Sequence, residues 1–226
     1  MIIFGINMKN MQIIIPKGSV IMQTDLKNSR TRMNLMRAFA GECQSRQRYY
    51  QAALLAQQQK LIGIERMFRF TAEQEERHAM VFWKLLQECA GETVEIEAGF
   101  PADVYEDIGQ LLDASQREEE KEHIVVYPDF ARIAEEEGFA QAASKFRAIA
   151  EIENEHSTRF AYYAWLYREG KLFRSDDAQQ RWICLNCGHV HVGSEPPQEC
   201  PVCSAEQGYF IREAEAAFTS CEIMKQ

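Results

Sequence analysis

Two short motifs in the sequence pair a glutamate with a histidine three residues later: Glu75 with His78, and Glu153 with His156. Side chains at i and i+3 lie on one face of an α-helix, so each pair can present a carboxylate and an imidazole together. Three more glutamates occupy positions where a helical pattern calls for apolar residues: Glu42, Glu119 and Glu122. A buried carboxylate is costly unless it is paired or binds a metal. Oxygen-rich ligation with two imidazoles suits iron or manganese better than zinc or copper.

Each of these motifs, taken alone, is typical of a solvent-exposed helix face. Their spacing makes the combination more specific, because Glu42 precedes Glu75 by 33 residues and Glu119 precedes Glu153 by 34 residues. The two halves therefore look like a repeat in which a glutamate is followed by an ExxH pair. One glutamate from each of two helices, with ExxH from the other two, is the arrangement of di-iron carboxylate bundles.

Four stretches with the apolar period of an α-helix must position these ligands. They span residues 29–59, 63–90, 102–137 and 139–168. Pro128 is expected to kink the third helix, whose inward face is expected to continue through Val126, Phe130 and Ile133. Residues 91–101, between the second and third helices, can extend over about 33 Å and so cross the length of a bundle. This connectivity predicts a mainly α, ferritin-like four-helix bundle with a long crossover.

Four of the seven cysteines form a second candidate site near the C-terminus: Cys184, Cys187, Cys200 and Cys203. Two CxxC pairs supply four thiolates for zinc or a single iron, and the spacing alone does not separate these metals. Gly188 and Pro201 favour tight turns that aim backbone N–H groups at sulfur. His189 and His191 are expected on the surface, because four cysteines already complete the ligand set.

The composition narrows the function classes. A net charge of −9 argues against binding to a phosphate backbone, which needs clustered Lys and Arg. No run of about 18 apolar residues occurs, so no membrane span is expected. Two CxxC pairs with three scattered cysteines favour a metal site in a reducing compartment, and we expect a cytoplasmic location.

These motifs resemble the rubrerythrin family over residues 24–215. Five segments carry the resemblance: AFAGECQSRQRYY (38–50), TAEQEERHA (71–79), EEKEHIVVYPDFA (119–131), AEIENEHSTRF (150–160) and CLNCGHVHVGSEPPQECPVC (184–203). The resemblance implies a non-haem iron peroxidase that protects anaerobes and microaerophiles from hydrogen peroxide. It also implies that the small C-terminal domain is rubredoxin-like and β-rich, which favours iron over zinc at the four cysteines.

Carried over to this sequence, the resemblance implies that Glu75 and Glu153 bridge the two irons of the di-iron centre. Glu42 would then bind the first iron, while Glu119 and His156 would bind the second. The expected metal content is two non-haem irons in the bundle and one iron in the four-cysteine site.

The resemblance further implies a ligand exchange at the first iron. Glu122 would bind this iron in the oxidised state, and His78 would replace it in the reduced state. Tyr49 and Tyr127 match family tyrosines that hydrogen-bond around the site.

The domain organisation follows from these assignments. Residues 1–23 are expected to be a disordered N-terminal extension, and residues 24–172 the ferritin-like di-iron domain. Residues 173–181 are expected to link it to the rubredoxin-like domain, residues 182–226.

The predicted function is reduction of hydrogen peroxide to water in oxidative-stress defence, by a homodimer. Electrons are expected to pass through the rubredoxin-like iron from rubredoxin or an NAD(P)H-dependent reductase, because no glycine forms a GxGxxG motif after a strand. Three alternatives remain open at this point. They are ferroxidase or oxygen-reductase activity at the same centre, iron storage, and a zinc-stabilised binding module.

Overall fold

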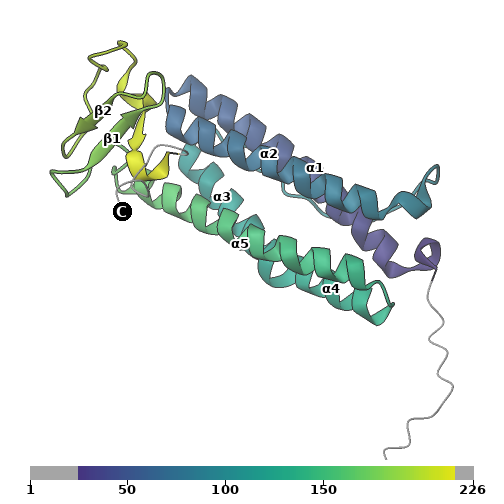
Figure 1. Cartoon of the computed structure of the whole chain (residues 1–226). Helices are drawn as coiled ribbons and strands as arrows, with labels where there is room; N and C mark the ends of the chain where they lie inside the picture. The colour runs from purple at the N-terminus through teal and green to yellow at the C-terminus, as the bar shows by residue number, and fades with distance from the viewer. Residues whose placement is uncertain (1–24, 217–226) are drawn as a thin grey trace, which may run out of the picture.

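The computed structural model describes residues 25–216, so the expected N-terminal extension lies outside the described residues. Its helices are α1 Arg30–Gln58, α2 Ile62–Leu85, α3 Ile108–Lys121, α4 Tyr127–Glu136 and α5 Ala140–Arg168, and a π-helical turn, η3 Glu122–Val126, joins α3 to α4 (Figure 1). Short 3-10 turns occur at η1 Leu26–Asn28, η2 Gln87–Cys89, η4 Gln207–Tyr209 and η5 Glu213–Glu215. The strands are β1 Arg181–Cys184, β2 Val190–Val192 and β3 Phe210–Arg212. The predicted fold class, a mainly α four-helix bundle followed by a small β-rich domain, is confirmed, whereas the exact domain limits stay predictions.

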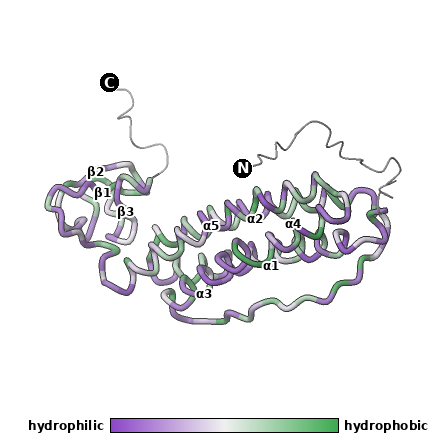
Figure 2. Tube along the Cα trace, turned by 90° about the horizontal axis from the view of Figure 1, so that it is seen from below, coloured by the Kyte–Doolittle hydropathy of each residue, from purple (hydrophilic) through white to green (hydrophobic). Residues whose placement is uncertain are grey.

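A long crossover joins the two halves of the bundle. Helix α1 packs on α2, and α3 and α4 pack on α5, while the chain from η2 to α3 runs along the outside (Figure 2). Side chains of α1 fasten this crossover. Arg37 donates from Nε to the carbonyl of Glu97 at 3.1 Å, and Arg48 pairs through Nη1 with Asp103 at 3.1 Å. These contacts hold the crossover against α1 along the outside of the bundle.

Two predicted helix boundaries were wrong. The third helix begins at Ile108 instead of residue 102, because the side chain of Asp107 caps it by accepting from the backbone N–H of Gln110 at 2.8 Å. The second helix ends at Leu85, and η2 continues the chain as a 3-10 turn. Such tightening of a last turn is common at helix ends.

The third predicted helix is also not a single kinked helix. The π-turn η3 replaces the expected kink, and Pro128 follows at the start of α4, where its missing N–H costs no hydrogen bond. A π-turn inserts one residue into the helical repeat. The inward face therefore shifts by one position, from the predicted Val126, Phe130 and Ile133 to the buried residues Tyr127, Ala131 and Ala134.

Two apolar clusters lie along the bundle on either side of the glutamates. One contains Leu35, Phe82, Tyr127 and Phe146, and the other contains Tyr49, Phe68, Leu112 and Phe160. Along each helix the candidate ligands fall between members of the two clusters. Apolar packing at both ends thus removes the carboxylates from water and leaves a polar layer inside the core.

The cysteine domain is a three-stranded antiparallel sheet in the order β2-β1-β3, seated at one end of the bundle (Figure 1). Gly208 approaches the turn between α1 and α2 so closely that an added Cβ would lie 1.7 Å from the carbonyl oxygen of Lys60. Lys60 also pairs with Glu206 at 2.6 Å. A side chain at residue 208 would clash with this turn and displace the cysteine domain from the end of the bundle.

The sequence predicts no membrane span. Within residues 25–216, no helix has an apolar stretch long enough to cross a bilayer.

Candidate metal centres

Two groups of ligand-type side chains meet in the polar layer of the bundle. The first consists of Glu42, Glu75, His78 and Glu153, and the second of Glu75, Glu119, Glu153 and His156. In each group the donor atoms all lie within 4.8 Å of one another, and every residue is buried. The structure thus brings together six of the seven predicted di-iron ligands. Glu75 and Glu153 belong to both groups, which is the geometry that bridging carboxylates require.

The donor atoms converge on common points. Nδ1 of His156 lies 2.9 Å from Oε1 of Glu75 and 2.8 Å from Oε2 of Glu153, yet all three atoms lack a hydrogen-bond partner. Oε2 of Glu42 and Oε2 of Glu119 are buried and unpartnered as well. Buried polar atoms without partners are rare in native proteins. A bound cation at each group would satisfy them, so the donor set fits two metal ions.

The charges of the groups support the same conclusion. Burial, followed by the neighbouring Glu153 and Glu75, raises the pKa of Glu42 well above its usual value. Burial likewise raises the pKa of Glu119 to about 8. Burial opposes ionisation of Glu75 too, but the close imidazoles of His156 and His78 favour its charged form and lower its pKa to about 2. Without metal the cluster therefore holds protons that two divalent cations would displace.

Two tyrosines donate to carboxylates of opposite groups. The Tyr49 hydroxyl on α1 donates to Oε1 of Glu119 on α3, and the Tyr127 hydroxyl on α4 donates to Oε1 of Glu42 on α1. Burial raises both tyrosine pKa values well above 10, so the hydroxyls remain protonated donors. Each hydrogen bond leaves the second oxygen of its glutamate free to face a metal.

Glu122 is the predicted ligand that lies outside both groups. It is partly exposed and lines a pocket of about 120 Å³, together with Gln44, Arg48 and Tyr127. The crossover residues 98–101 form the outer wall of this pocket. A pocket of this size holds several water-sized molecules, so it can admit a small polar molecule as far as Tyr127, which donates to Glu42 of the first group.

Sequence reasoning missed two polar residues beside His156. Gln74 precedes Glu75, and Arg159 lies one helical turn after His156. Gln74 contacts His156 on the side of the ring away from the carboxylates, and Arg159 donates to Gln74. The i,i+3 spacing of His156 and Arg159 was a usable signal, since it places the two side chains on one face of α5.

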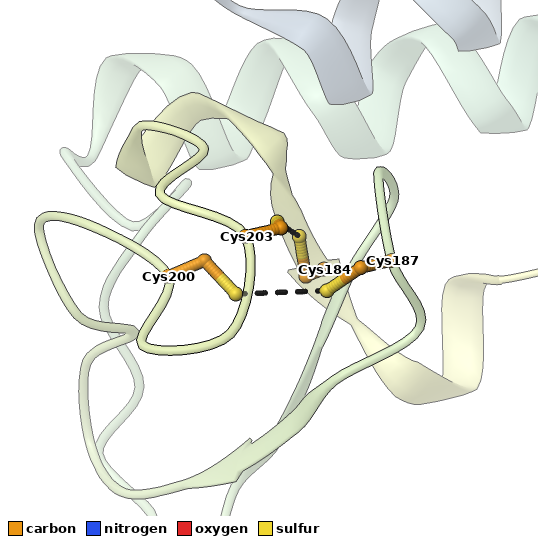
Figure 3. Close-up of side chains that lie close together, drawn as sticks. All are labelled: Cys184, Cys187, Cys200 and Cys203. Carbon is orange, nitrogen blue, oxygen red and sulfur yellow. Dashed lines mark hydrogen bonds between the residues drawn. The ribbon is translucent and has the colours of Figure 1, made fainter.

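The four cysteines face one another at the edge of the small sheet (Figure 3). The Sγ atoms of Cys184 and Cys203 are 3.8 Å apart, and those of Cys187 and Cys200 are 3.7 Å apart. Four sulfurs bound at about 2.3 Å in a tetrahedron lie about 3.8 Å from each other. These two separations match one tetrahedral metal, and all four sulfurs lie within 4.8 Å of one another.

The turns around the cysteines supply hydrogen bonds to sulfur. Gly188 has a φ of +79°, which a residue with a side chain rarely adopts, and its N–H closes the first turn onto the carbonyl of Cys184 at 2.8 Å. The side chain of Asn186 and the backbone N–H of Ala205 lower the pKa of Cys203 to about 6. A thiolate is thus available for metal binding at neutral pH.

Without bound metal, the protein is expected to lose stability as the pH rises above 5. In the folded state the pKa of Glu119 is about 8 and that of His156 is about 12, against ordinary values of 4.5 and 6.5. The folded state therefore keeps protons that the unfolded chain releases, Glu119 between pH 4.5 and 8 and His156 above pH 6.5. Within its pH range, each proton that only the folded state keeps lowers the free energy of unfolding by about 1.4 kcal/mol for every unit by which the pH rises. Glu75 has the opposite effect, but only below pH 4.5.

Thermal unfolding of chelator-treated protein at pH 5.5 and pH 8 measures this effect. The melting temperature should fall by several degrees at the higher pH. Metal-loaded protein is the control, because binding requires deprotonated ligands and the gap between loaded and free protein should widen with pH. A gap that stays constant would contradict the buried, proton-holding cluster.

Comparisons with known proteins agree with this geometry. The family model described as rubrerythrin matches residues 33–163, and the model described as the rubredoxin-like domain of rubrerythrin matches residues 182–211. The rubrerythrin of Clostridium perfringens is 41% identical over 186 residues, which cover 82% of this chain and 95% of that protein. The rubrerythrin of Nitratidesulfovibrio vulgaris is 40% identical over 185 residues, with the same coverage.

Solved structures show the same fold. The fully reduced, all-ferrous state of nigerythrin matches with a TM-score of 0.55 at 26% identity, over 90% of this chain and 98% of that one. Symerythrin from Cyanophora paradoxa, reduced with dithionite, matches with a TM-score of 0.54 at 21% identity, over 66% of this chain and 90% of that one. With the family models covering both metal-binding regions and curated relatives near 40% identity, this chain belongs to the rubrerythrin family.

Proposed function

We propose that this protein reduces hydrogen peroxide to water at its di-iron centre. Membership of the rubrerythrin family makes it an iron oxidoreductase of oxidative-stress defence, with a di-iron site and a rubredoxin-like iron site. The proposal adds the substrate and the route of the electrons. The observation that carries it is the pair of ligand groups sharing Glu75 and Glu153, beside a pocket lined by Tyr127, whose hydroxyl donates to Glu42.

The proposed ligand assignment follows the two groups. Glu75 and Glu153 would bridge the irons and Glu42 would complete the first site with His78. In the second site, Glu119 and His156 would be the terminal ligands, each lying in that group alone. Tyr49 and Tyr127 would orient the terminal carboxylates through the hydrogen bonds described above.

When bound, two ferrous ions supply the two electrons that cleave the O–O bond of hydrogen peroxide, and two protons complete two waters. The residues of the chain create the conditions for this step. The pocket beside Glu122 admits a small polar molecule, and Arg48 and Gln44 on its wall offer hydrogen-bond donors to it. The flanking apolar clusters keep bulk water from the ligands.

The rubredoxin-like iron is proposed to return electrons one at a time. Cys184, Cys187, Cys200 and Cys203 would hold it. Rubredoxin or an NAD(P)H-dependent reductase would be the external donor, and the cytoplasm the site of action. The proposed working unit is a homodimer.

Turnover with hydrogen peroxide and with oxygen should separate the proposed activity from its rivals. Anaerobically purified protein should contain about three irons per chain, two in the carboxylate site and one in the thiolate site. Chemically reduced protein should then react faster with hydrogen peroxide than with oxygen in stopped-flow mixing. Faster reaction with oxygen would favour an oxygen reductase or ferroxidase. Zinc at the cysteines with no iron in the bundle would end the redox proposal.

Glu122→Ala is expected to raise the midpoint potential of the di-iron centre. In the structure His78 lies in the first group and Glu122 outside it, as proposed for the reduced state. Two ferrous ions balance four carboxylates, whereas two ferric ions favour recruitment of a fifth. Loss of that carboxylate should destabilise the diferric state relative to the diferrous state by tenfold or more, a rise of about 30 mV or more for this two-electron couple.

A redox titration followed spectroscopically measures this potential. Glu118→Ala, on the pocket rim but outside both ligand groups, is the matched control and should leave the potential unchanged. An unchanged or lower potential in Glu122→Ala would argue against the ligand exchange.

A further inference from the structure

The imidazole of His156 has a hydrogen-bond partner on the side away from the metal cluster. Its Nδ1 faces Glu75, Glu119 and Glu153, while its Nε2 lies 3.1 Å from Oε1 of Gln74 on α2. The ring is completely buried. Such outer hydrogen bonds fix the orientation and tautomer of a metal-binding histidine.

Arg159 determines which atom Gln74 presents to the ring. Its Nη1 donates to Oε1 of Gln74 at 3.0 Å and to Oγ1 of Thr71 at 2.9 Å. A guanidinium has no acceptor, so the atom of Gln74 that faces it must be the amide oxygen. The same oxygen faces His156, and Nε2 must therefore carry a proton and donate.

Each remaining member of the network has one possible hydrogen-bond direction. The Thr71 hydroxyl donates its own proton to the carbonyl of Met67 at 3.1 Å, which leaves its oxygen to accept from Arg159. With Nε2 protonated, a neutral His156 can only present a lone pair at Nδ1, toward the carboxylates. The network thus selects the tautomer that a metal ion needs.

Burial of Arg159 indicates that these contacts matter. The side chain lies mostly inside the protein, and burial lowers its pKa from the usual value. Its Cζ lies 5.1 Å from the centre of the Phe70 ring, a cation–π contact that offsets part of the desolvation. The guanidinium also reaches the wall of a cavity of about 600 Å³ that Cys184 lines from the other domain.

The two metal-site histidines differ in this respect. Nδ1 of His78 lies near Glu42, Glu75 and Glu153 in the same manner. Among residues 25–216, however, no group hydrogen-bonds to its Nε2. His78 is therefore held only from the metal side, whereas His156 is held from both sides.

We propose that Gln74 and Arg159 are positioning residues that lock His156 as a permanent ligand of the second iron. The absence of such a lock on His78 leaves that histidine free to leave the first iron. This second statement rests on the ligand exchange proposed above, whereas the lock itself does not.

Metal affinity and the state of the His156 ring test the lock without an activity assay. Gln74→Leu and Arg159→Leu should weaken binding of one of the two bundle metals 10- to 100-fold in anaerobic competition with a ferrous chelator. Arg159→Lys keeps a donor to Gln74 and should stay near wild type. Thr71→Val removes the other acceptor of Arg159 but not the His156 contact, and should also stay near wild type.

Zinc-loaded protein, which is diamagnetic, reports the ring directly by ¹⁵N–¹H NMR. In the wild type and in Thr71→Val, the Nε2 proton of His156 should be visible and slow to exchange with solvent. In Gln74→Leu this Nε2 proton should exchange rapidly. The helicity of the variant and the visible ferric thiolate absorption of its iron-loaded form should stay unchanged. Wild-type affinity and slow exchange in Gln74→Leu, or an equal loss in Thr71→Val, would overturn the proposal. These outcomes do not depend on whether peroxide is the substrate.

Discussion

Cys184→Ser is expected to abolish NAD(P)H-coupled turnover while leaving a single round of peroxide reduction intact. Cys184 is one of four cysteines whose sulfurs lie within 4.8 Å of one another, and a serine hydroxyl is a poor substitute ligand. Loss of this iron should remove the entry point for electrons. The bundle and its ligands should be unaffected, so chemically reduced protein should still consume about one peroxide per di-iron centre.

Glu75→Ala should produce the opposite result. Glu75 belongs to both ligand groups, and its substitution removes one carboxylate from each. The peroxide reaction should be lost, whereas the visible absorption of the ferric thiolate site should remain and show that the chain is folded. Coupled turnover should fall at least about 100-fold in both variants.

Two matched variants control for non-specific damage. Cys43→Ser replaces an exposed cysteine outside the four-cysteine group, and Glu73→Ala replaces an exposed glutamate two residues before Glu75. Both should keep coupled and single-turnover activity. If Cys184→Ser also lost the single-turnover reaction, the relay role of the cysteine iron would be wrong.

The helices and the ligand groups could be predicted because both depend on local spacing. The i,i+3 pairs Glu75 with His78 and Glu153 with His156 share a helix face in any α-helix, so the structure only had to bring the faces together. Glu42 was recognisable because it interrupts an apolar stripe. The CxxC pairs were recognisable for a similar reason, since each pair needs only one tight turn.

The π-turn η3 could not be predicted from periodicity. At each step of the inward face after Glu122, two adjacent residues are apolar: Val126 and Tyr127, Phe130 and Ala131, Ile133 and Ala134. Either member of each pair could face the core, so the pattern fits both registers. The extra residue of the π-turn turns the second member of each pair toward the core and so buries Tyr127 beside Glu42.

The hydrogen bonds of Gln74 and Arg159 around His156, and the contact between the cysteine domain and the bundle, could not be predicted for another reason. Gln74 and Arg159 are polar residues close to ligands. The i,i+3 spacing places Arg159 on the same helix face as His156, but the sequence does not show that Gln74 on another helix meets them there. Gly208 meets Lys60 across 148 residues of chain, and no local pattern encodes that contact. Both features depend on which elements pack together.

Activity is expected to return when two inactive variants are mixed if, as proposed, electrons cross between the subunits of a dimer. Within one chain the cysteine domain sits at the end of the bundle, with Ile211 against Gly63 at the start of α2. Glu75 lies 12 residues further along α2, about 18 Å along the axis. Cys184 and Arg159 both line the cavity of about 600 Å³, and unfilled space of this kind makes the route within one chain a poor one.

A head-to-tail neighbour could instead place its cysteine domain directly against the flank of the di-iron bundle. Glu75→Ala subunits keep the cysteine iron, and Cys184→Ser subunits keep the di-iron centre. A heterodimer then has one intact pair of centres across the interface and should recover up to about half of the wild-type activity. Mixing Cys184→Ser with Cys187→Ser is the control and should stay inactive, because neither chain has a cysteine iron. If native mass spectrometry shows subunit exchange and the Glu75→Ala mixture remains inactive, electrons travel within one chain, past the cavity wall that Arg159 forms.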